Sequence, residues 1–324
     1  MIARRAPLGL TLDEIDDAAA LIVDVVPPTP SYRWPTVCER YGLDITLKHE
    51  NHTRIGAFKV RGGLTYVDAL RRREPHVRRV VCATRGNHGQ SIALAASRSG
   101  LHATIVVPHG NSVEKNDAMR ALGAELVVHG ADYDEAKAHA TSLVANDSAA
   151  HWIPSYHRDL VRGVATYARE LFASGAFDAV YVPIGQGSGI SGVIAVRDLL
   201  GLETEVVGVV SDRFPAYALS LARGEVVETS AASTIADGMA VRVPDAAALD
   251  VVRDGAARVV TVPDDAVRDA MRALFADTHN VAEGAGAAAL AAVAADRELL
   301  RGKRVAAIVS GGNVDAAVVA GVLA

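Results

Sequence analysis

The chain has 324 residues, of which 50% are hydrophobic and 22% charged, which is enough apolar material for one large domain or for two lobes. A formal charge of −5, with no basic run interleaved with aromatic residues, argues against a nucleic-acid partner. Two cysteines cannot form a disulfide framework and no uncharged apolar run is long enough to span a membrane, so we expect a cytoplasmic protein without a membrane partner.

From about residue 43 the sequence alternates short apolar runs, typical of strands, with longer helical patterns. In chain order we expect a strand at 43–50, a helix at 57–73, a strand at 78–84, a helix at 87–100, a strand at 102–108, a helix at 112–125, a strand at 126–130, helices at 133–147 and 160–175, a strand at 177–184, a helix at 185–201, strands at 205–211 and 256–263, two Ala-rich helices, and a final strand and helix within 304–324. Continuous apolar strands separated by helices indicate an α/β fold with a parallel sheet covered on both faces. About eight such cycles fit either a barrel or two open sheets.

The first segment whose residues could take part in catalysis is "NHTRIGAFKVRGG", residues 51–63. It places Lys59 between Phe58 and Val60, where a loop is expected to become a helix. A lysine with apolar neighbours at such a point is a candidate nucleophile whose amine is partly desolvated. An ordinary surface lysine is the alternative.

Three later segments lie at strand-to-helix junctions, where open α/β sheets bind ligands. In "CATRGNHGQS" (82–91) two glycines bracket Asn87 and His88 at a helix start, whose free N–H groups attract an anion. A plain turn explains this segment equally well. In "AIVSGGNVD" (307–315), Ser310 ends a strand, and an ordinary turn capped by Asn313 is the simpler interpretation of that segment alone.

The third junction, "VPIGQGSGISG" (182–192), has the glycine spacing of a phosphate cradle. Its "GSGISG" also satisfies the dinucleotide fingerprint, with Asp212 at the end of the next strand. That fingerprint normally occurs in the first βα unit of a domain, whereas this match follows several units. Lys59, the phosphate cradle and an anion-binding helix start are together what a pyridoxal phosphate enzyme needs.

Six segments in this order resemble the fold-type II pyridoxal phosphate enzymes, most closely the threonine/serine dehydratase branch that includes serine racemase and threonine ammonia-lyase. They are "KHENHTRIGAFKVRGG", "TRGNHGQS", "PIGQGSGISG", "TIADGMAV", "VAEGAGAAAL" and "VSGGNVD", and the resemblance runs from about residue 20 almost to the C-terminus. It implies two open, mostly parallel twisted sheets with helices on both faces, as in tryptophan synthase β. It also implies a cofactor in the cleft between a large domain (1–55 and 152–324) and a small domain (56–151), with approximate boundaries.

The resemblance also implies site residues. Lys59 matches the Schiff-base lysine and Ser310 the hydroxyl that faces the pyridine nitrogen, so both are candidate catalytic residues. Contacts to the cofactor, pyridoxal 5′-phosphate, are implied for Phe58, Lys59, Asn87, Gly185, Gln186, Gly187, Ser188, Gly189, Gly238, Glu283 and Ser310. Contacts to the substrate are implied for Thr84, Arg85, Asn87 and His88. Gln186 and Ser188 replace glycines that are common in the family, but both can still present backbone N–H groups.

Two departures from the family narrow the expected chemistry. Arg85 occupies the position at which racemases of the group carry an acid/base serine, and arginine stays protonated to about pH 12. Its side chain either turns away to solvent or a neighbouring carboxylate, or points inward and pairs with a substrate carboxylate, a β-carboxylate included. Val210 or Ser211 stands where racemase-like relatives have an acidic metal ligand, so we expect no metal there.

We therefore expect a pyridoxal phosphate-dependent dehydratase that converts a β-hydroxy-α-amino acid to a 2-oxo acid and ammonia. Threonine or serine is the default substrate, and 3-hydroxyaspartate or a phenylserine is an alternative. Racemisation or β-replacement on the same scaffold, a nicotinamide-dependent oxidoreductase that uses "GSGISG", and a binding protein without turnover remain as rival functions. A homodimer or higher homo-oligomer is expected.

Overall fold

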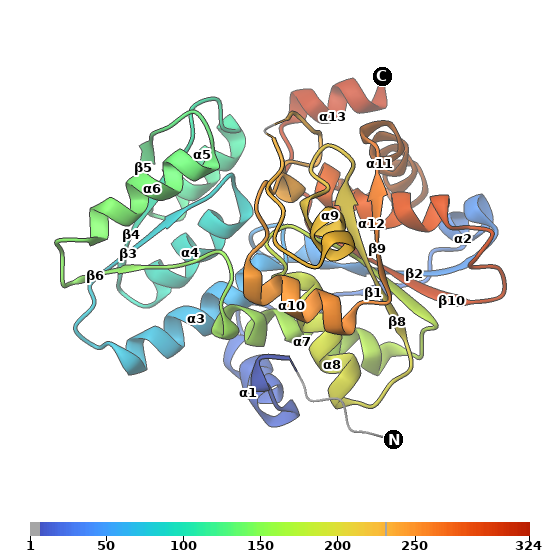
Figure 1. Ribbon diagram of the computed structural model, residues 1–324, viewed down its shortest axis with the longest axis horizontal. Coiled ribbons are helices and arrows are strands. Elements are labelled where there is room, and N and C mark those ends of the chain that lie inside the picture. The colour runs from blue at the N-terminus through green and yellow to red at the C-terminus, as the bar shows by residue number, and fades with distance from the viewer. Residues whose placement is uncertain (1–6, 231) are drawn as a thin grey trace.

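The computed structural model describes residues 7–230 and 232–324 and contains two open sheets in two lobes (Figure 1). The larger sheet has the order β1-β2-β10-β7-β8-β9, with β1 (Ser31–Tyr32), β2 (Asp44–His49), β7 (Ala179–Pro183), β8 (Glu205–Ser211), β9 (Arg258–Val262) and β10 (Arg304–Val309). The smaller sheet has the order β5-β4-β3-β6, with β3 (Arg79–Ala83), β4 (His102–Val107), β5 (Glu125–Val128) and β6 (Ala150–Trp152). The pairing of β1 with β2 is antiparallel and the other pairings are parallel. Two open, mostly parallel sheets confirm the expected fold and exclude the barrel.

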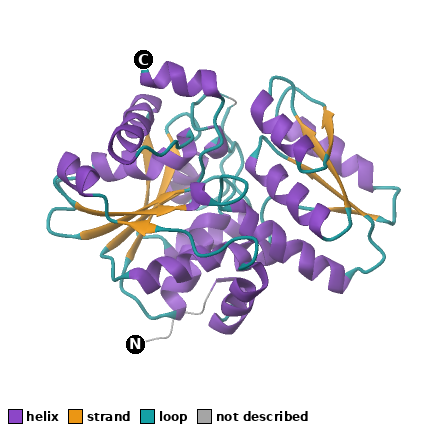
Figure 2. Ribbon diagram, turned by 180° about the vertical axis from the view of Figure 1, so that it is seen from behind, coloured by secondary structure: helices purple, strands orange, loops and turns teal. Residues whose placement is uncertain are grey.

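Helices cover both faces of each sheet, as Figure 2 shows. They are α1 (Leu12–Ile22), α2 (Pro35–Tyr41), α3 (Lys59–Arg73), α4 (Asn87–Arg98), α5 (Val113–Ala121), α6 (Tyr133–Val144), α7 (Arg158–Ser174), α8 (Ser188–Leu199), α9 (Ala216–Arg223), α10 (Ala246–Gly255), α11 (Asp264–Thr278), α12 (Gly284–Ala295) and α13 (Ala316–Leu323), with short 3₁₀ turns η1 (Pro7–Gly9), η2 (Glu50–His52) and η3 (Asp237–Met239). In the described residues no helix is both long enough and apolar enough to cross a membrane. The four-stranded sheet with α3 to α6 forms the smaller lobe in Figure 1. The predicted domain boundaries at residues 56 and 152 stay an interpretation of this division.

Helix α12 positions one wall of the cleft. Its sequence "GAGAAALAAVAA" has small apolar residues on every side, so it can be buried all round, and residues 284–293 are buried. It packs against β7, β8, β9 and β10. A Cβ atom on Gly286 would lie 2.1 Å from the carbonyl oxygen of Gly311. The helix therefore touches the turn after β10, which carries Ser310.

A close crossing of α3 and α7 fixes the start of α3 against the larger lobe. A Cβ atom on Gly163 would lie 2.2 Å from the Arg61 carbonyl oxygen, so only glycine allows this approach. The buried Arg61 side chain pairs with Glu50 at 2.8 Å and with Glu170 at 2.6 Å. Lys48 also pairs with Glu170 at 2.6 Å. Buried charges are tolerated when they are paired in this way, and the network anchors the turn that begins with Lys59.

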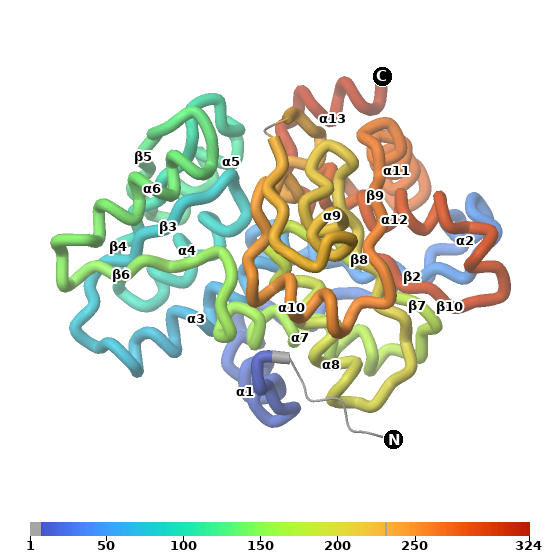
Figure 3. The backbone as a smooth tube through the Cα atoms, viewed as in Figure 1, coloured from blue at the N-terminus to red at the C-terminus, as the bar shows by residue number. Residues whose placement is uncertain are grey.

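Several short elements show too little hydrophobic periodicity to be predicted from the sequence. They are α1, β1, α2, β6, α9 and α10. In β6, three half-buried residues complete the smaller sheet by pairing with β3. Helix α10 begins inside the tract 232–250 that shows no periodicity. The chain between α9 and α10 runs along the side of the larger lobe that faces the smaller one (Figure 3). Arg242 in this tract pairs with Asp132 of the smaller lobe at 3.1 Å.

Candidate active site

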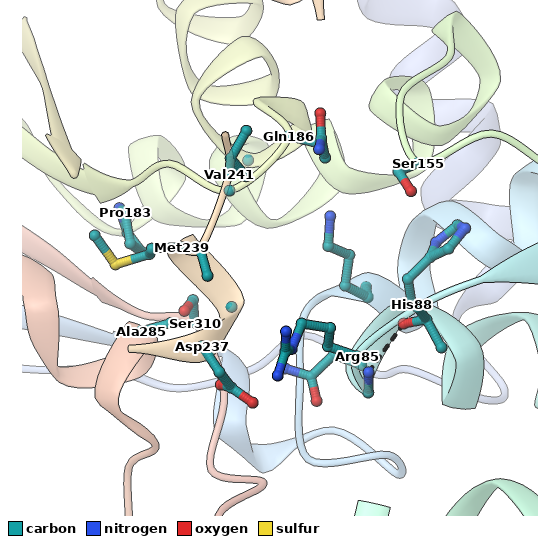
Figure 4. A pocket seen from close by; sticks show the side chains of 18 of the residues that line it. Arg85, His88, Ser155, Pro183, Gln186, Asp237, Met239, Val241, Ala285 and Ser310 are labelled. Atoms are coloured by element: carbon teal, nitrogen blue, oxygen red, sulfur yellow. Dashed lines mark hydrogen bonds between the residues drawn. The ribbon is translucent and has the colours of Figure 1, made fainter. Parts of the chain in front are cut away.

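One pocket between the lobes is formed at the carboxyl ends of β3, β7 and β10, where parallel sheets bind ligands (Figure 4). It brings together all the site residues that the sequence predicted: Phe58, Lys59, Thr84, Arg85, Asn87, His88, Gly185, Gln186, Gly187, Ser188, Gly189, Gly238, Glu283 and Ser310. Their individual roles stay predictions.

Lys59 is the first residue of α3 and extends along the pocket wall. Its Nζ donates a hydrogen bond to Ser188 Oγ at 3.2 Å and lies 5.0 Å from the centre of the Phe58 ring. Burial of the amine lowers the pKa of Lys59 to about 8. The backbone N–H of Phe58 donates to the Ser310 carbonyl at 3.1 Å, so the loop before Lys59 is tied to the turn after β10. A neutral, nucleophilic amine is thus accessible near neutral pH.

The loop after β7 forms a close-fitting cradle. A Cβ atom on Gly185 would lie 2.5 Å from the Gly238 carbonyl oxygen. Gly187 has a φ of +98°, and a Cβ atom there would lie 2.7 Å from the Ala248 Cβ. Gly187 also caps α8 without a side chain, so the first N–H groups of this helix have no acceptor in the helix and can hold an anion.

A second open helix start, that of α4, follows β3. Its cap, Gly86, provides no side-chain acceptor. The Thr84 hydroxyl oxygen accepts hydrogen bonds from the N–H groups of Gly86 at 2.9 Å and Gly89 at 3.3 Å, which shapes the loop. Burial lowers the pKa of His88 to about 3, with a contribution from the nearby Lys59 charge, so its imidazole is neutral. The His88 Nε2 is buried without a hydrogen-bond partner.

Asn87 is the first residue of α4 and Ser310 directly follows β10, and both border the pocket. The Ser310 hydroxyl borders the pocket and has no side-chain hydrogen bond within residues 7–230 and 232–324. The Asn87 amide nitrogen donates to Glu283 at 2.6 Å, and the Asn87 oxygen accepts from Asn313 at 2.8 Å. An amide nitrogen has two N–H groups, so one donor of Asn87 remains for a ligand.

Sequence reasoning missed two charged residues of the pocket, Lys115 and Asp237. The Lys115 ammonium pairs with Asp237 at 2.8 Å and with Glu283 at 3.2 Å. Burial alone lowers the pKa of Lys115, but the two carboxylates outweigh it and raise that pKa. Burial raises the pKa of Glu283, while Lys115 opposes the shift. Asp237 belongs to the segment "TIADGMAV" that carries the resemblance, whereas nothing marks Lys115 within its helix.

Arg85 lies in the pocket wall on the loop between β3 and α4. Figure 4 shows its guanidinium extended into the pocket, on the side where Asp237 is drawn. No carboxylate lies within ion-pair distance of it in the described part of the chain, and its Nε is buried without a hydrogen-bond partner. Of the two orientations left open by the sequence, the structure has the inward one.

The residues that rival functions require lie elsewhere. Asp212, the acidic residue of the dinucleotide fingerprint, is exposed and does not border the pocket. Ser211 makes hydrogen bonds to Thr234 and to the Arg213 backbone. Across residues 7–230 and 232–324 no cluster of three or more His, Cys, Asp or Glu residues could hold a metal ion.

Comparison with known proteins agrees with this geometry. Residues 22–311 match the family described as Pyridoxal-phosphate dependent enzyme. The L-threonine ammonia-lyase of Thermotoga maritima is 33% identical over 307 residues, which are 94% of this chain and 76% of that protein. The biosynthetic L-threonine dehydratase of Escherichia coli strain K12 is 32% identical over 300 residues, which are 91% of this chain but only 58% of that protein. The structure of maize serine racemase superposes with a TM-score of 0.89 at 27% identity and 96% coverage of both chains.

Proposed function

The chain belongs to the family of pyridoxal-phosphate dependent enzymes, in its threonine dehydratase-like branch of fold type II, and we propose that it is an ammonia-lyase acting on a β-hydroxy-α-amino acid. The family matches confirm the predicted family, fold and cofactor. The single observation that carries the proposal is the Lys59 amine, with its pKa lowered to about 8, in one pocket with an anion cradle and with Ser310, whose hydroxyl makes no hydrogen bond among the described residues.

The residues present fit the cofactor. The loop from Gly185 to Gly189 has no room for side chains at two of its glycines, and the first N–H groups of α8 have no side-chain cap, so they can hold the phosphate. The spare N–H of Asn87 suits the phenolic oxygen, and the free Ser310 hydroxyl suits the pyridine nitrogen. Lys59 supplies the amine for covalent attachment.

Bound pyridoxal phosphate withdraws electron density from the α-carbon of an amino acid and so acidifies its α-proton. Once the substrate amine has displaced it from the cofactor, Lys59 Nζ, neutral in part near neutral pH, would take that proton, and the Ser188 hydroxyl would hold the amine in place. Ser310 is a neutral partner that does not hold the ring nitrogen protonated, which favours rapid loss of the β-hydroxyl. The substrate loses a proton and hydroxide as water, and the released enamine hydrolyses to a 2-oxo acid and ammonia.

The start of α4 is the proposed site for the substrate α-carboxylate. Its free N–H groups follow Gly86, and the Thr84 hydroxyl lies beside them. His88 contributes no charge there because burial keeps its imidazole neutral. The carboxylate is thus oriented by backbone dipoles and a hydroxyl.

Racemisation is the second candidate, since the fold is similar to that of maize serine racemase. It needs an acid/base on the ring face opposite the lysine with a pKa near the working pH. Arg85 lies where racemases of the group have that serine, and a guanidinium does not exchange protons readily. We therefore propose racemisation as a side reaction at most.

The test is a panel of amino acids incubated with the purified holoenzyme and assayed for 2-oxo acid release. We expect release from β-hydroxy amino acids and little interconversion of D- and L-serine.

Borohydride reduction followed by peptide mapping should place the cofactor on Lys59. Attachment to another lysine, or a panel with β-replacement products and no 2-oxo acid, would contradict the proposal. A colourless protein that binds NADH tightly would favour the oxidoreductase. The cytoplasmic location and homo-oligomeric state stay predictions.

A further inference from the structure

Arg85 is a cation in the pocket that forms no ion pair with any of residues 7–230 and 232–324. Its guanidinium points inward in Figure 4, its Nε is buried without a partner, and no described carboxylate pairs with it. A partly buried, unpaired charge is unfavourable, and charges of this kind in a binding site are satisfied by a ligand. The missing partner is therefore an anionic group of a bound molecule.

The cofactor phosphate is not that partner. The phosphate cradle includes Gln186, and in Figure 4 Gln186 lies at the opposite side of the pocket from Arg85. The substrate α-carboxylate already has the open start of α4, which needs no added cation. What remains is a second anionic group on the substrate.

The neighbouring carboxylates do not prevent such a group from binding. Asp237 and Glu283 both border the pocket, but each is paired with Lys115, at 2.8 Å and 3.2 Å. Their charge is thus partly compensated within the chain, whereas the charge of Arg85 is not. Lys115 and the two carboxylates together keep one net negative charge, which Arg85 balances without an ion pair to either carboxylate among the described residues, so its guanidinium donors stay open to an anion.

We infer that Arg85 is a specificity residue that selects substrates with a second carboxylate on the β-carbon, of the 3-hydroxyaspartate type, over serine and threonine. The inference rests on the proposed function, because the β-hydroxyl must still leave. A guanidinium can bind a carboxylate through two parallel hydrogen bonds, which positions the β-carbon as well as adding affinity. The reaction then removes water from the substrate, and hydrolysis of the enamine returns water and yields oxaloacetate and ammonia.

The first experiment compares kcat/KM for 3-hydroxyaspartate, in its threo and erythro forms, with kcat/KM for serine and threonine. In the wild type the better 3-hydroxyaspartate isomer should be preferred. Arg85→Met should reduce the ratio of the two values by at least about 30-fold, the scale of a lost charge-assisted pair. Arg85→Lys should keep part of the preference because it keeps the charge. Thermal unfolding of each variant checks that it folds.

Arg98→Met is the matched control. Arg98 is the last residue of α4, the helix that follows the Arg85 loop, so it lies roughly 17 Å from the start of that helix, and it is exposed and does not border the pocket. The change removes the same charge from the end of α4 that is remote from Arg85. It should leave the preference for 3-hydroxyaspartate as in the wild type. An equal loss in Arg98→Met and Arg85→Met would overturn the inference, because the effect would then be one of net charge.

A binding measurement separates this inference from the chemistry. Malonate has two carboxylates but neither amine nor hydroxyl, and acetate has one carboxylate. Calorimetry on the holoenzyme should show malonate bound more tightly than acetate, with at least about 30-fold weaker malonate binding in Arg85→Met. Equal malonate affinity in Arg85→Met and wild type overturns the inference. Turnover of serine or threonine but not of 3-hydroxyaspartate also overturns it, and leaves the proposed function intact. If no hydroxy amino acid releases a 2-oxo acid, the proposed function fails and the substrate assignment falls with it.

Discussion

Two arginines near the cleft have opposite environments. Arg61 is completely buried, and its guanidinium donates to Glu50, Glu170 and two threonine hydroxyls. Arg85, half-buried in the pocket wall, has no carboxylate partner among the described residues, and its Nε donates no hydrogen bond to them. Lys59, two residues before Arg61, donates one hydrogen bond among the described residues, to the Ser188 hydroxyl, and has no carboxylate partner there. The chain supplies the ion-pair partners of Arg61, whereas Arg85 and Lys59 keep donors for ligands although they share the pocket with the paired Lys115.

The largest effect expected from this contrast is at Lys59. Lys59→Met should reduce 2-oxo acid release by about a thousandfold or more, because both the attachment point and the base disappear. The free energy of unfolding of the apo protein should stay unchanged or rise, since a partly desolvated amine is replaced by an apolar side chain. Activity assays and urea unfolding measure the two quantities. A strongly destabilised Lys59→Met protein would show that this lysine stabilises the fold, as Arg61 does, and would contradict the prediction.

Arg61→Met should mainly reduce stability, whereas Lys59→Met should mainly reduce activity. It leaves Glu50 and Glu170 with Lys48 as their remaining cation in this network, and breaking a buried ion pair typically costs about 3–5 kcal/mol of unfolding free energy. Urea unfolding of the apo protein measures this loss directly. Adding Glu50→Gln to Arg61→Met should recover part of the loss by removing an unpaired charge. A stable Arg61→Met protein with full activity would contradict the assignment.

Gly187→Val tests the cradle. The positive φ and the 2.7 Å approach to Ala248 both oppose a side chain, so cofactor affinity should fall by tenfold or more, about 1–2 kcal/mol of strain. Absorbance titration of the apo protein with pyridoxal phosphate measures it. Gly201→Val is the control, because Gly201 also has positive φ but lies in open space just after α8. That variant should lose stability and keep cofactor affinity; equal affinities in the two variants would refute the cradle.

The smallest expected effect is a pH shift. The neutral amine is the form that reacts with an aldehyde, so attachment of pyridoxal phosphate to the apo protein should accelerate as pH rises and level off above about 8, the lowered pKa of Lys59. An ordinary lysine would continue to gain rate to about pH 10.4. Stopped-flow absorbance across pH 6–10.5 measures the profile, with Lys59→Met as the blank. A rate that still rises above pH 10 would show that the amine is not desolvated.

The sequence predicted the parts of this contrast that depend on local pattern. Continuous apolar runs reveal buried strands, and the glycines around Lys59 and Ser188 mark turns, but this pattern fitted a barrel as well as two sheets. The two sheets and the pocket residues followed from the resemblance to the pyridoxal phosphate enzymes. Lys115 could not, because its meeting with Asp237 and Glu283 depends on how the lobes are placed relative to each other. The orientation of Arg85 was left open for the same reason, since neighbours that are distant along the chain decide it. Short elements such as β6 are stabilised by their partners and carry little pattern of their own.

Helix α12 can lie close to the turn after β10 because Gly286 has no side chain. Gly286 and the Gly311 carbonyl approach so closely that even one methyl group on the helix would displace the turn that carries Ser310. A Gly286→Ala change adds a good helix former to a helix, and the resulting protein is expected to fold with its pocket out of alignment. A substitution can thus lower activity at a residue that touches no ligand, because a wider helix displaces the turn that carries Ser310.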